Sequence, residues 1–69
     1  MISYTPLWKT LAEKGIKKTV LRDMIGVSNG TLARMGKNQY IEMRHIDTIC
    51  QVLNCEISDV IRIERTEQE

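Results

Sequence analysis

The stretch TVLRDMIGVSNGTLARM, residues Thr19 to Met35, decides the fold of this chain. Leu21 and Ile25 lie one helical turn apart and lead into Gly26, and apolar residues at helical spacing resume after it. Glycine adopts the positive φ of a tight turn at little cost, whereas most other residues need about 1–2 kcal/mol. The hydroxyl oxygen of Ser28 is suited to cap a helix that starts at the next residue. The stretch therefore predicts two short helices joined by a tight turn.

Five helices account for most of the chain, so the predicted fold class is all-α. The first is capped by Thr5, takes Pro6 in its first turn and ends at Gly15. The turn motif, about residues 18–35, supplies helices over 18–25 and 29–35. The fourth ends at Asn54 and is predicted by an apolar stripe on one helical face. That stripe consists of Met43, Ile46, Ile49, Cys50 and Leu53. A last short helix starts at Ser58.

The residues before the first predicted helix and after the last one alternate between apolar and polar, which permits a short β-strand at each place. Ile2 and Tyr4 alternate at one end, and Ile61 and Ile63 alternate at the other. Two residues of alternation are too few to distinguish pairing within one chain, pairing between two chains, and frayed ends. We expect residues 65–69 to form a flexible polar tail.

Length and composition exclude several classes of protein. We expect 69 residues to form a single domain, residues 1–69, without room for a catalytic cavity. The sequence contains no membrane-spanning run and no signal peptide, so a cytoplasmic location with reduced Cys50 and Cys55 is expected. His45 and Cys50 fall on different helical faces, so no metal site is expected. No pair of catalytic side chains or phosphate-binding loop is recognisable, which predicts neither an enzyme nor a cofactor.

The distribution of charge points to nucleic acid, although the net charge is only +1. Eight basic and three acidic residues precede His45, which gives this part a charge of +5. From His45 onward, two basic and six acidic residues give −4. The turn motif lies inside the basic part, where its second helix can enter a DNA major groove. The predicted partner is therefore double-stranded DNA.

About residues 7–61 resemble the Cro/CI-type, XRE-like, helix-turn-helix domains, and most of all the short stand-alone members called YozG-like. The resemblance rests on Leu21, Gly26-Val27-Ser28, Thr31-Leu32, Gly36-Lys37-Asn38, Ile49-Cys50, Leu53-Asn54-Cys55 and Asp59-Val60-Ile61. It implies a compact five-helix, lambda-repressor-like domain. It also implies a transcriptional regulator, usually a repressor, whose third helix reads the major groove as part of a homodimer.

The resemblance assigns roles to individual positions of this sequence. The side chains expected to read bases are Ser28, Asn29, Thr31 and Arg34. Those expected to contact phosphates are Lys17, Lys18, Lys37, Asn38 and Gln39. In such roles, an asparagine addresses adenine N6 and N7, and an arginine addresses guanine O6 and N7. Phosphate contacts fix the register of the protein on DNA rather than its sequence preference.

Three residues depart from the common pattern of the family. Arg22 replaces an alanine, so either its guanidinium reaches out past the turn or the two helices are splayed. Gly36 replaces a glutamate that pairs with an arginine of the first helix. Gly30 gives the reading helix a bare first turn that permits close approach of the backbone.

The apolar residues near the C-terminus, together with two near the N-terminus, suggest how the protein assembles and what else it could bind. The apolar residues outside the turn motif are the expected contact of a two-fold dimer. They are Ile57, Val60, Ile61 and Ile63, with Ile2 and Tyr4. The alternative is a protein-interaction module, such as an antitoxin-like or phage anti-regulator domain. Its docking face would be built by the fourth helix and the C-terminal helix.

Overall fold

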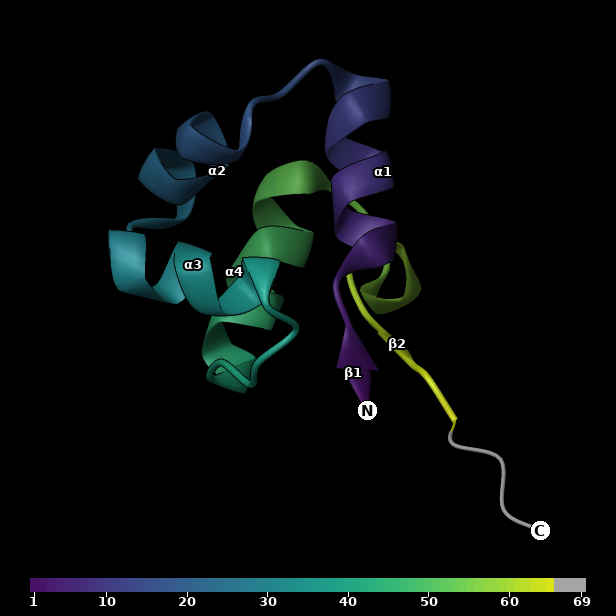
Figure 1. Ribbon diagram of the computed structural model, residues 1–69. Coiled ribbons are helices and arrows are strands. Elements are labelled where there is room, and N and C mark those ends of the chain that lie inside the picture. The colour runs from purple at the N-terminus through teal and green to yellow at the C-terminus, as the bar shows by residue number, and fades with distance from the viewer. Residues whose placement is uncertain (66–69) are drawn as a thin grey trace, which may run out of the picture.

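The computed structural model describes residues 1–65 as a mostly helical domain with a small sheet (Figure 1). The elements are β1 (Ile2–Ser3), α1 (Thr5–Lys14), α2 (Lys18–Ile25), α3 (Asn29–Gly36), α4 (Met43–Leu53), the 3-10 turn η1 (Ile57–Asp59) and β2 (Arg62–Ile63). None of the helices in this part of the chain has both the length and the apolar character needed to cross a bilayer. Apart from Arg65, the predicted tail lies outside the described residues.

Three helix ends have the left-handed backbone that their residue types predict. Gly15 and Gly26 end α1 and α2 at φ values of 69° and 71°. Asn54 ends α4 at φ 52°. Glycine adopts this conformation without a clash of its Cβ, and asparagine tolerates it better than most residues do. These residues therefore stop each helix where the sequence predicts.

The start of α1 differs from the prediction by one residue. Tyr4, rather than Thr5, is the N-cap, and its side chain makes no capping bond. The hydroxyl of Ser3 accepts the N–H of Thr5 at 3.2 Å instead. Thr5 fails to cap because the strand before it places Ser3 within reach of the first free N–H group of the helix.

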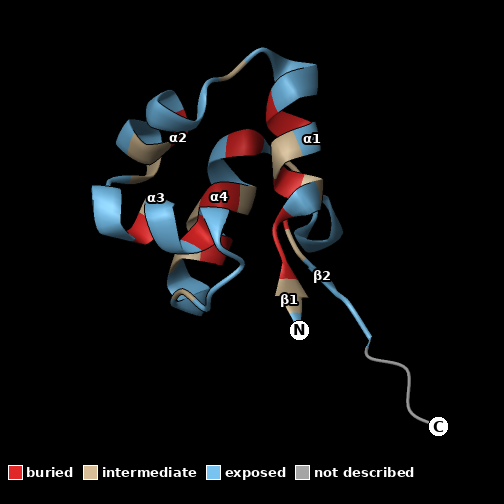
Figure 2. Cartoon of the chain, viewed as in Figure 1, coloured by how far each residue is buried: buried red, intermediate tan, exposed pale blue. Residues whose placement is uncertain are grey.

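The core joins one apolar face of each helix to the chain ends, as the inward-facing buried residues in Figure 2 show. Its buried side chains are Tyr4, Leu7, Leu11, Leu21, Met35, Ile46, Ile49, Leu53 and Val60. The stripe predicted on α4 supplies three of them. Met43 is an exception, with 62% of its surface exposed, because it is the first residue of α4 and lies beyond the packed turns.

The predicted fifth helix is a single 3-10 turn, η1. The N–H of Glu56 donates to Asp59 Oδ2 at 3.0 Å, which caps the turn. Helix α1 occupies the carbonyl groups that a longer helix would need. The Thr10 hydroxyl donates to the Asp59 carbonyl at 2.8 Å, and the Leu7 N–H donates to the Val60 carbonyl at 3.2 Å. The prediction of a helix from Ser58 was wrong because contacts to α1 replace its hydrogen bonds.

The two chain ends pair with each other within one chain. Strands β1 and β2 are antiparallel, with Ile2 opposite Ile63 and Ser3 opposite Arg62. The N–H of Glu64 continues the ladder by donating to the Met1 carbonyl at 2.7 Å. Of the three arrangements that the sequence left open, the structure contains the intrachain pair.

Tyr4 ties this sheet to the loop that follows α3. Its hydroxyl donates to the Gln39 carbonyl at 2.7 Å, and its N–H donates to Asn38 Oδ1 at 3.1 Å. Burial raises the pKa of Tyr4, which keeps the phenol protonated as the donor that this bond needs. Tyr4 was predicted to be a dimer contact, but it is completely buried and is unavailable for one.

Replacing Gly26 with alanine tests the turn. We expect Gly26→Ala to lower the free energy of unfolding by about 1–2 kcal/mol, because φ is positive there. Gly36→Ala is the matched control, since a Cβ at either glycine meets no atom within 4 Å. Gly36 is helical, so the control should be neutral or up to about 1 kcal/mol more stable. Denaturant unfolding followed by circular dichroism gives the free energy of unfolding of each variant. Equal changes in the two variants would show that the positive φ at Gly26 is not required by the turn.

Candidate nucleic-acid interface

Helices α2 and α3 form the predicted helix-turn-helix. The N–H groups of Gly26 and Val27 both donate to the Arg22 carbonyl, at 2.9 and 3.3 Å, which closes α2. Ser28 then caps α3, because its hydroxyl accepts the N–H of Thr31 at 3.1 Å. Leu21 and Met35 anchor the two helices in the core. In Figure 1 the two helices lie together at one side of the domain, away from α1.

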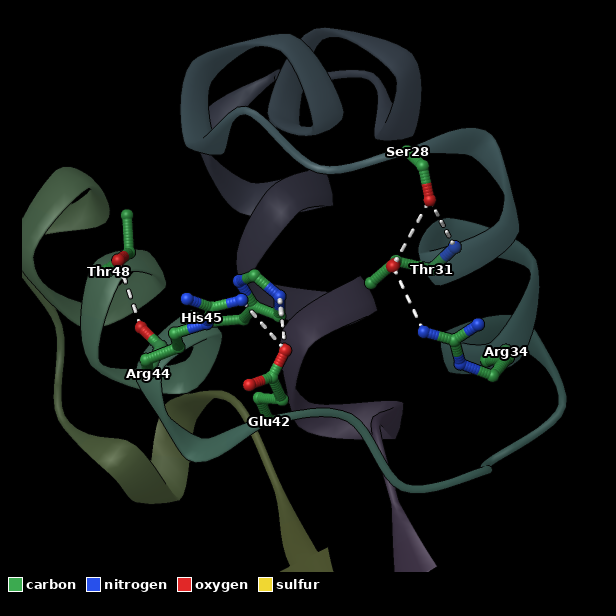
Figure 3. Close-up of polar contacts among 7 residues, drawn as sticks. All are labelled: Ser28, Thr31, Arg34, Glu42, Arg44, His45 and Thr48. Carbon is green, nitrogen blue, oxygen red and sulfur yellow. Dashed lines mark hydrogen bonds and ion pairs between the residues drawn. The ribbon is translucent and has the colours of Figure 1, made fainter.

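A short hydrogen-bonded chain runs along the first turns of α3 (Figure 3). The Ser28 hydroxyl donates to Thr31 Oγ1 at 3.3 Å, and the Arg34 guanidinium donates to the same oxygen at 3.1 Å. Ser28 and Arg34 are exposed, so the chain has an accessible group at each end. These bonds restrict the rotamers of both exposed side chains before any ligand arrives.

Thr31 lies inside this chain rather than on the surface. Only 6% of its surface is exposed, which leaves little of the side chain for a base. Its position is buried because α3 turns this face toward the core next to Met35. The Thr31 hydroxyl, which was expected to meet a base, instead accepts hydrogen bonds from Ser28 and Arg34.

Gly30 leaves open space beside the same chain. A Cβ at this position would lie 3.6 Å from Ser28 Oγ and 4.0 Å from an Arg34 guanidinium nitrogen, which are ordinary contact distances. The guanidinium thus folds back along the bare first turn of α3. Glycine at this position adds no side chain of its own between Ser28 and Arg34.

Asn29 is connected to α2 through Arg22. The terminal Nη1 of Arg22 donates to Asn29 Oδ1, and Nε donates to Asp23 Oδ1 at 3.0 Å. The Arg22 side chain is 26% exposed. Of the two arrangements considered for Arg22, the guanidinium reaches out, and it reaches across the turn to the first residue of α3.

The predicted phosphate contacts fall into two groups. Lys17 and Lys18 are exposed at the start of α2, and the Lys18 ammonium lies 4.2 Å from the centroid of the Trp8 ring. This cation–π contact attaches α2 to α1. The second group, Lys37 to Gln39, is exposed directly after α3. Asn38 contributes only its amide NH₂ there, because its oxygen accepts from Tyr4.

Sequence reasoning missed the bond between Arg22 and Asn29. The two residues are seven positions apart and lie on different helices, so no helical or strand period relates them. The available signal was the long, charged Arg22 at a position next to the turn, which does not identify its partner. Only the crossing of α2 and α3 brings the two side chains together.

The apolar residues predicted as a dimer contact are only partly available. Ile57 and Ile63 are exposed, and 66% of the Ile63 surface is accessible. Ile61 is half-buried. Val60 is completely buried under α1, so the prediction that it forms a contact between two chains was wrong.

The cysteines and acidic residues form no further site in residues 1–65. Cys50 and Cys55 are free thiols, and burial followed by the neighbouring Cys50 raises the pKa of Cys55. A raised pKa keeps this thiol protonated and unreactive. Within the same residues, no three His, Cys, Asp or Glu side chains gather as potential metal ligands.

Comparison with known proteins agrees with this geometry. The crystal structure of the transcriptional regulator VanUg is similar to this chain, with 41% sequence identity and a TM-score of 0.86. The match covers 88% of this chain and 81% of that one. No curated protein sequence matches. Residues 6–65 match the family of Cro/C1-type HTH DNA-binding domains, which are not enzymes. The chain therefore belongs to the Cro/C1-type helix-turn-helix DNA-binding domains.

Proposed function

We propose that this domain regulates transcription by binding double-stranded DNA sequence-specifically, with α3 in the major groove. The observation that carries the proposal is the pair of exposed side chains, Ser28 and Arg34, that Thr31 holds on the first turns of α3. Recognition helices present this part of their surface to base edges. The similar protein, VanUg, is a transcriptional regulator, which supports the same role here.

Base recognition would rest mainly on Arg34 and Ser28. A guanidinium donates two parallel bonds to guanine O6 and N7, which contributes about 1–3 kcal/mol of discrimination. A serine hydroxyl both donates and accepts, so it discriminates less between bases. Asn29 was expected to read adenine, but its amide oxygen accepts a hydrogen bond from Arg22.

The phosphate contacts would flank the reading helix. Lys37 and Gln39 lie at the end of α3, and Lys17 and Lys18 lie at the start of α2. Each lysine that neutralises a phosphate releases a counterion and adds affinity without adding sequence information. The acidic part of the chain, after Arg44, would face away from the duplex.

Two copies are needed to find one site among about 10⁶ or more genomic competitors, since one short helix carries few reading side chains. We propose a homodimer that uses Ile2, Ile57, Ile61 and Ile63, which are the predicted contacts that retain exposed surface. Two-fold symmetry would select an inverted repeat. A dimer that covers both half-sites hinders the binding of other proteins to the same duplex, so we propose that the regulator is a repressor. We also propose that it acts in the cytoplasm.

A protein-interaction module is the second candidate. The apolar residues Met43, Val52 and Ile57, which are exposed on α4 and η1, favour it. Selection of bound fragments from random duplex DNA separates the two functions. An enriched inverted repeat supports the DNA-binding function, and recovery of random sequence only would favour the alternative.

Replacing Arg34 tests base recognition. We expect Arg34→Ala to lose about 1–3 kcal/mol on the selected site and to relax the preference at one base pair, because the bidentate contact is gone. Arg44→Ala is the matched control, since Arg44 is exposed and pairs with Glu42 at the start of α4 (Figure 3). Competition binding with single-base variants of the site measures both. If Arg34→Ala keeps the full preference, Arg34 does not read a base.

Replacing Lys37 tests the positioning contacts. Lys37→Ala should weaken binding to all sequences by the same factor and reduce the salt slope by about one phosphate. Lys9→Ala, which removes an exposed charge from α1, serves as the control and should leave the slope unchanged. Binding measured over a series of salt concentrations gives both slopes. Equal slopes for wild type and Lys37→Ala would remove Lys37 from the interface.

Replacing Ile63 tests the dimer. Ile63→Asp should abolish the two-chain complex on an inverted repeat with half-sites centred about 10 base pairs apart, because it buries a charge in the contact. The fold should survive, since Ile63 is exposed. Analytical ultracentrifugation with duplex measures the number of chains bound. A wild-type complex with one chain per duplex, or an unaffected Ile63→Asp complex, would contradict the dimer.

A further inference from the structure

Arg22 is held between two side chains at the junction of α2 and α3. Nε donates to Asp23 on its own helix, and Nη1 donates to the amide oxygen of Asn29 on the next. The bond to Asn29 spans the turn and links a side chain of α2 to a side chain of α3. The Arg22 side chain is 26% exposed, and Asn29 is exposed, so solvent reaches both members of the pair.

Arg22 and Asn29 together offer a ligand mainly hydrogen-bond donors. A guanidinium has five N–H donors and no acceptor, so the oxygen of Asn29, and not its nitrogen, must face Arg22. Two of the five donors are used, by Asp23 and Asn29. Among residues 1–65, the remaining guanidinium donors and the amide NH₂ of Asn29 have no hydrogen-bond partner, so they are available to a ligand. The pair offers donors and a positive charge, and one of the two lone pairs of its amide oxygen already accepts from Arg22.

Such a donor set complements a phosphate better than it complements adenine. The adenine edge presents N6–H₂, a donor, beside N7, an acceptor, and bidentate reading needs the asparagine oxygen directed at N6, whereas here it is directed at Arg22. A phosphate presents acceptor oxygens only, and charge-assisted bonds from arginine to phosphate are among the strong ones. Asp23 offsets part of the charge of Arg22, but its carboxylate is 71% exposed and is therefore screened by solvent.

We propose that Arg22 and Asn29 form a phosphate-binding pair, in which Arg22 both contacts the DNA backbone and fixes the amide of Asn29 with its NH₂ outward. The inference rests on the proposed DNA-binding function and changes the role of Asn29 from reading adenine to gripping the backbone. The pair then sets the depth and register of α3 in the groove, and sequence preference is left to Ser28 and Arg34.

Binding of Arg22→Ala to the preferred duplex and to random duplex, over a series of salt concentrations, tests the pair. Loss of one phosphate contact reduces the slope of log affinity against log salt by about 0.9. The defect should therefore be about three- to fourfold larger at 50 mM than at 200 mM salt, and the same for both duplexes. Arg22→Gln is a second variant that keeps much of the packing of the aliphatic stem but removes the charge, and its salt slope should equal that of Arg22→Ala.

Asn29 variants separate the pair from two independent contacts. Asn29→Ala should cost little more in the Arg22→Ala background than Arg22→Ala costs alone, because the amide is oriented by Arg22. Asn29→Asp keeps an acceptor for Arg22 but removes the donors and adds a negative charge, so it should weaken binding to all duplexes. Thermal unfolding of each variant shows whether it is folded, and salt slopes are compared only among folded variants.

Each outcome has a defined meaning. An unchanged salt slope in both Arg22 variants, or a defect confined to one base pair, would overturn the phosphate role. Additive effects of Arg22→Ala and Asn29→Ala would overturn the pair. If the wild-type chain binds no duplex at all, the proposed function fails; if it binds and the Arg22 variants keep its slope, only this inference fails.

Discussion

The angle between α2 and α3 depends on the backbone at Gly26 and on the Ser28 cap that follows it. Gly26 reverses the chain at φ 71°, and Ser28 begins the next helix two residues later by accepting the N–H of Thr31. The constraint at Gly26 is its positive φ rather than crowding, since a Cβ there would meet no atom within 4 Å. The arrangement of Ser28, Asn29 and Arg34 on α3 follows from this turn.

The chain ends hold the rest of the domain around that motif. Tyr4 donates from its hydroxyl and its N–H to the loop after α3, while Val60 and Asp59 accept from α1. Strands β1 and β2 join the two ends of the domain by pairing Ile2 with Ile63. These long-range bonds compensate for the small core of a 69-residue chain. They also place the loop from Lys37 to Gln39 beside the end of α3.

Local chemistry made most of the helices predictable from the sequence, and long-range contacts explain the failures. Gly15, Gly26 and Asn54 mark helix ends through their own backbone preference. Residues Ser58 to Val60 do not continue into a longer helix, because the Asp59 and Val60 carbonyl groups accept hydrogen bonds from α1. For the candidate site, the positions of Ser28 and Arg34 follow from helical periodicity. The burial of Thr31 and the bond between Arg22 and Asn29 required the packing of α3 and its crossing with α2.

The surface that meets DNA can be mapped directly by the amide chemical shifts of the labelled protein during titration with its selected duplex. Our account predicts that the largest changes fall on Ser28 to Arg34, on Lys37 to Gln39, and on the start of α2. The face of α4 that carries Met43 and Val52 should change little. Changes concentrated on that face, with α3 unaffected, would contradict the central claim that α3 is the reading helix.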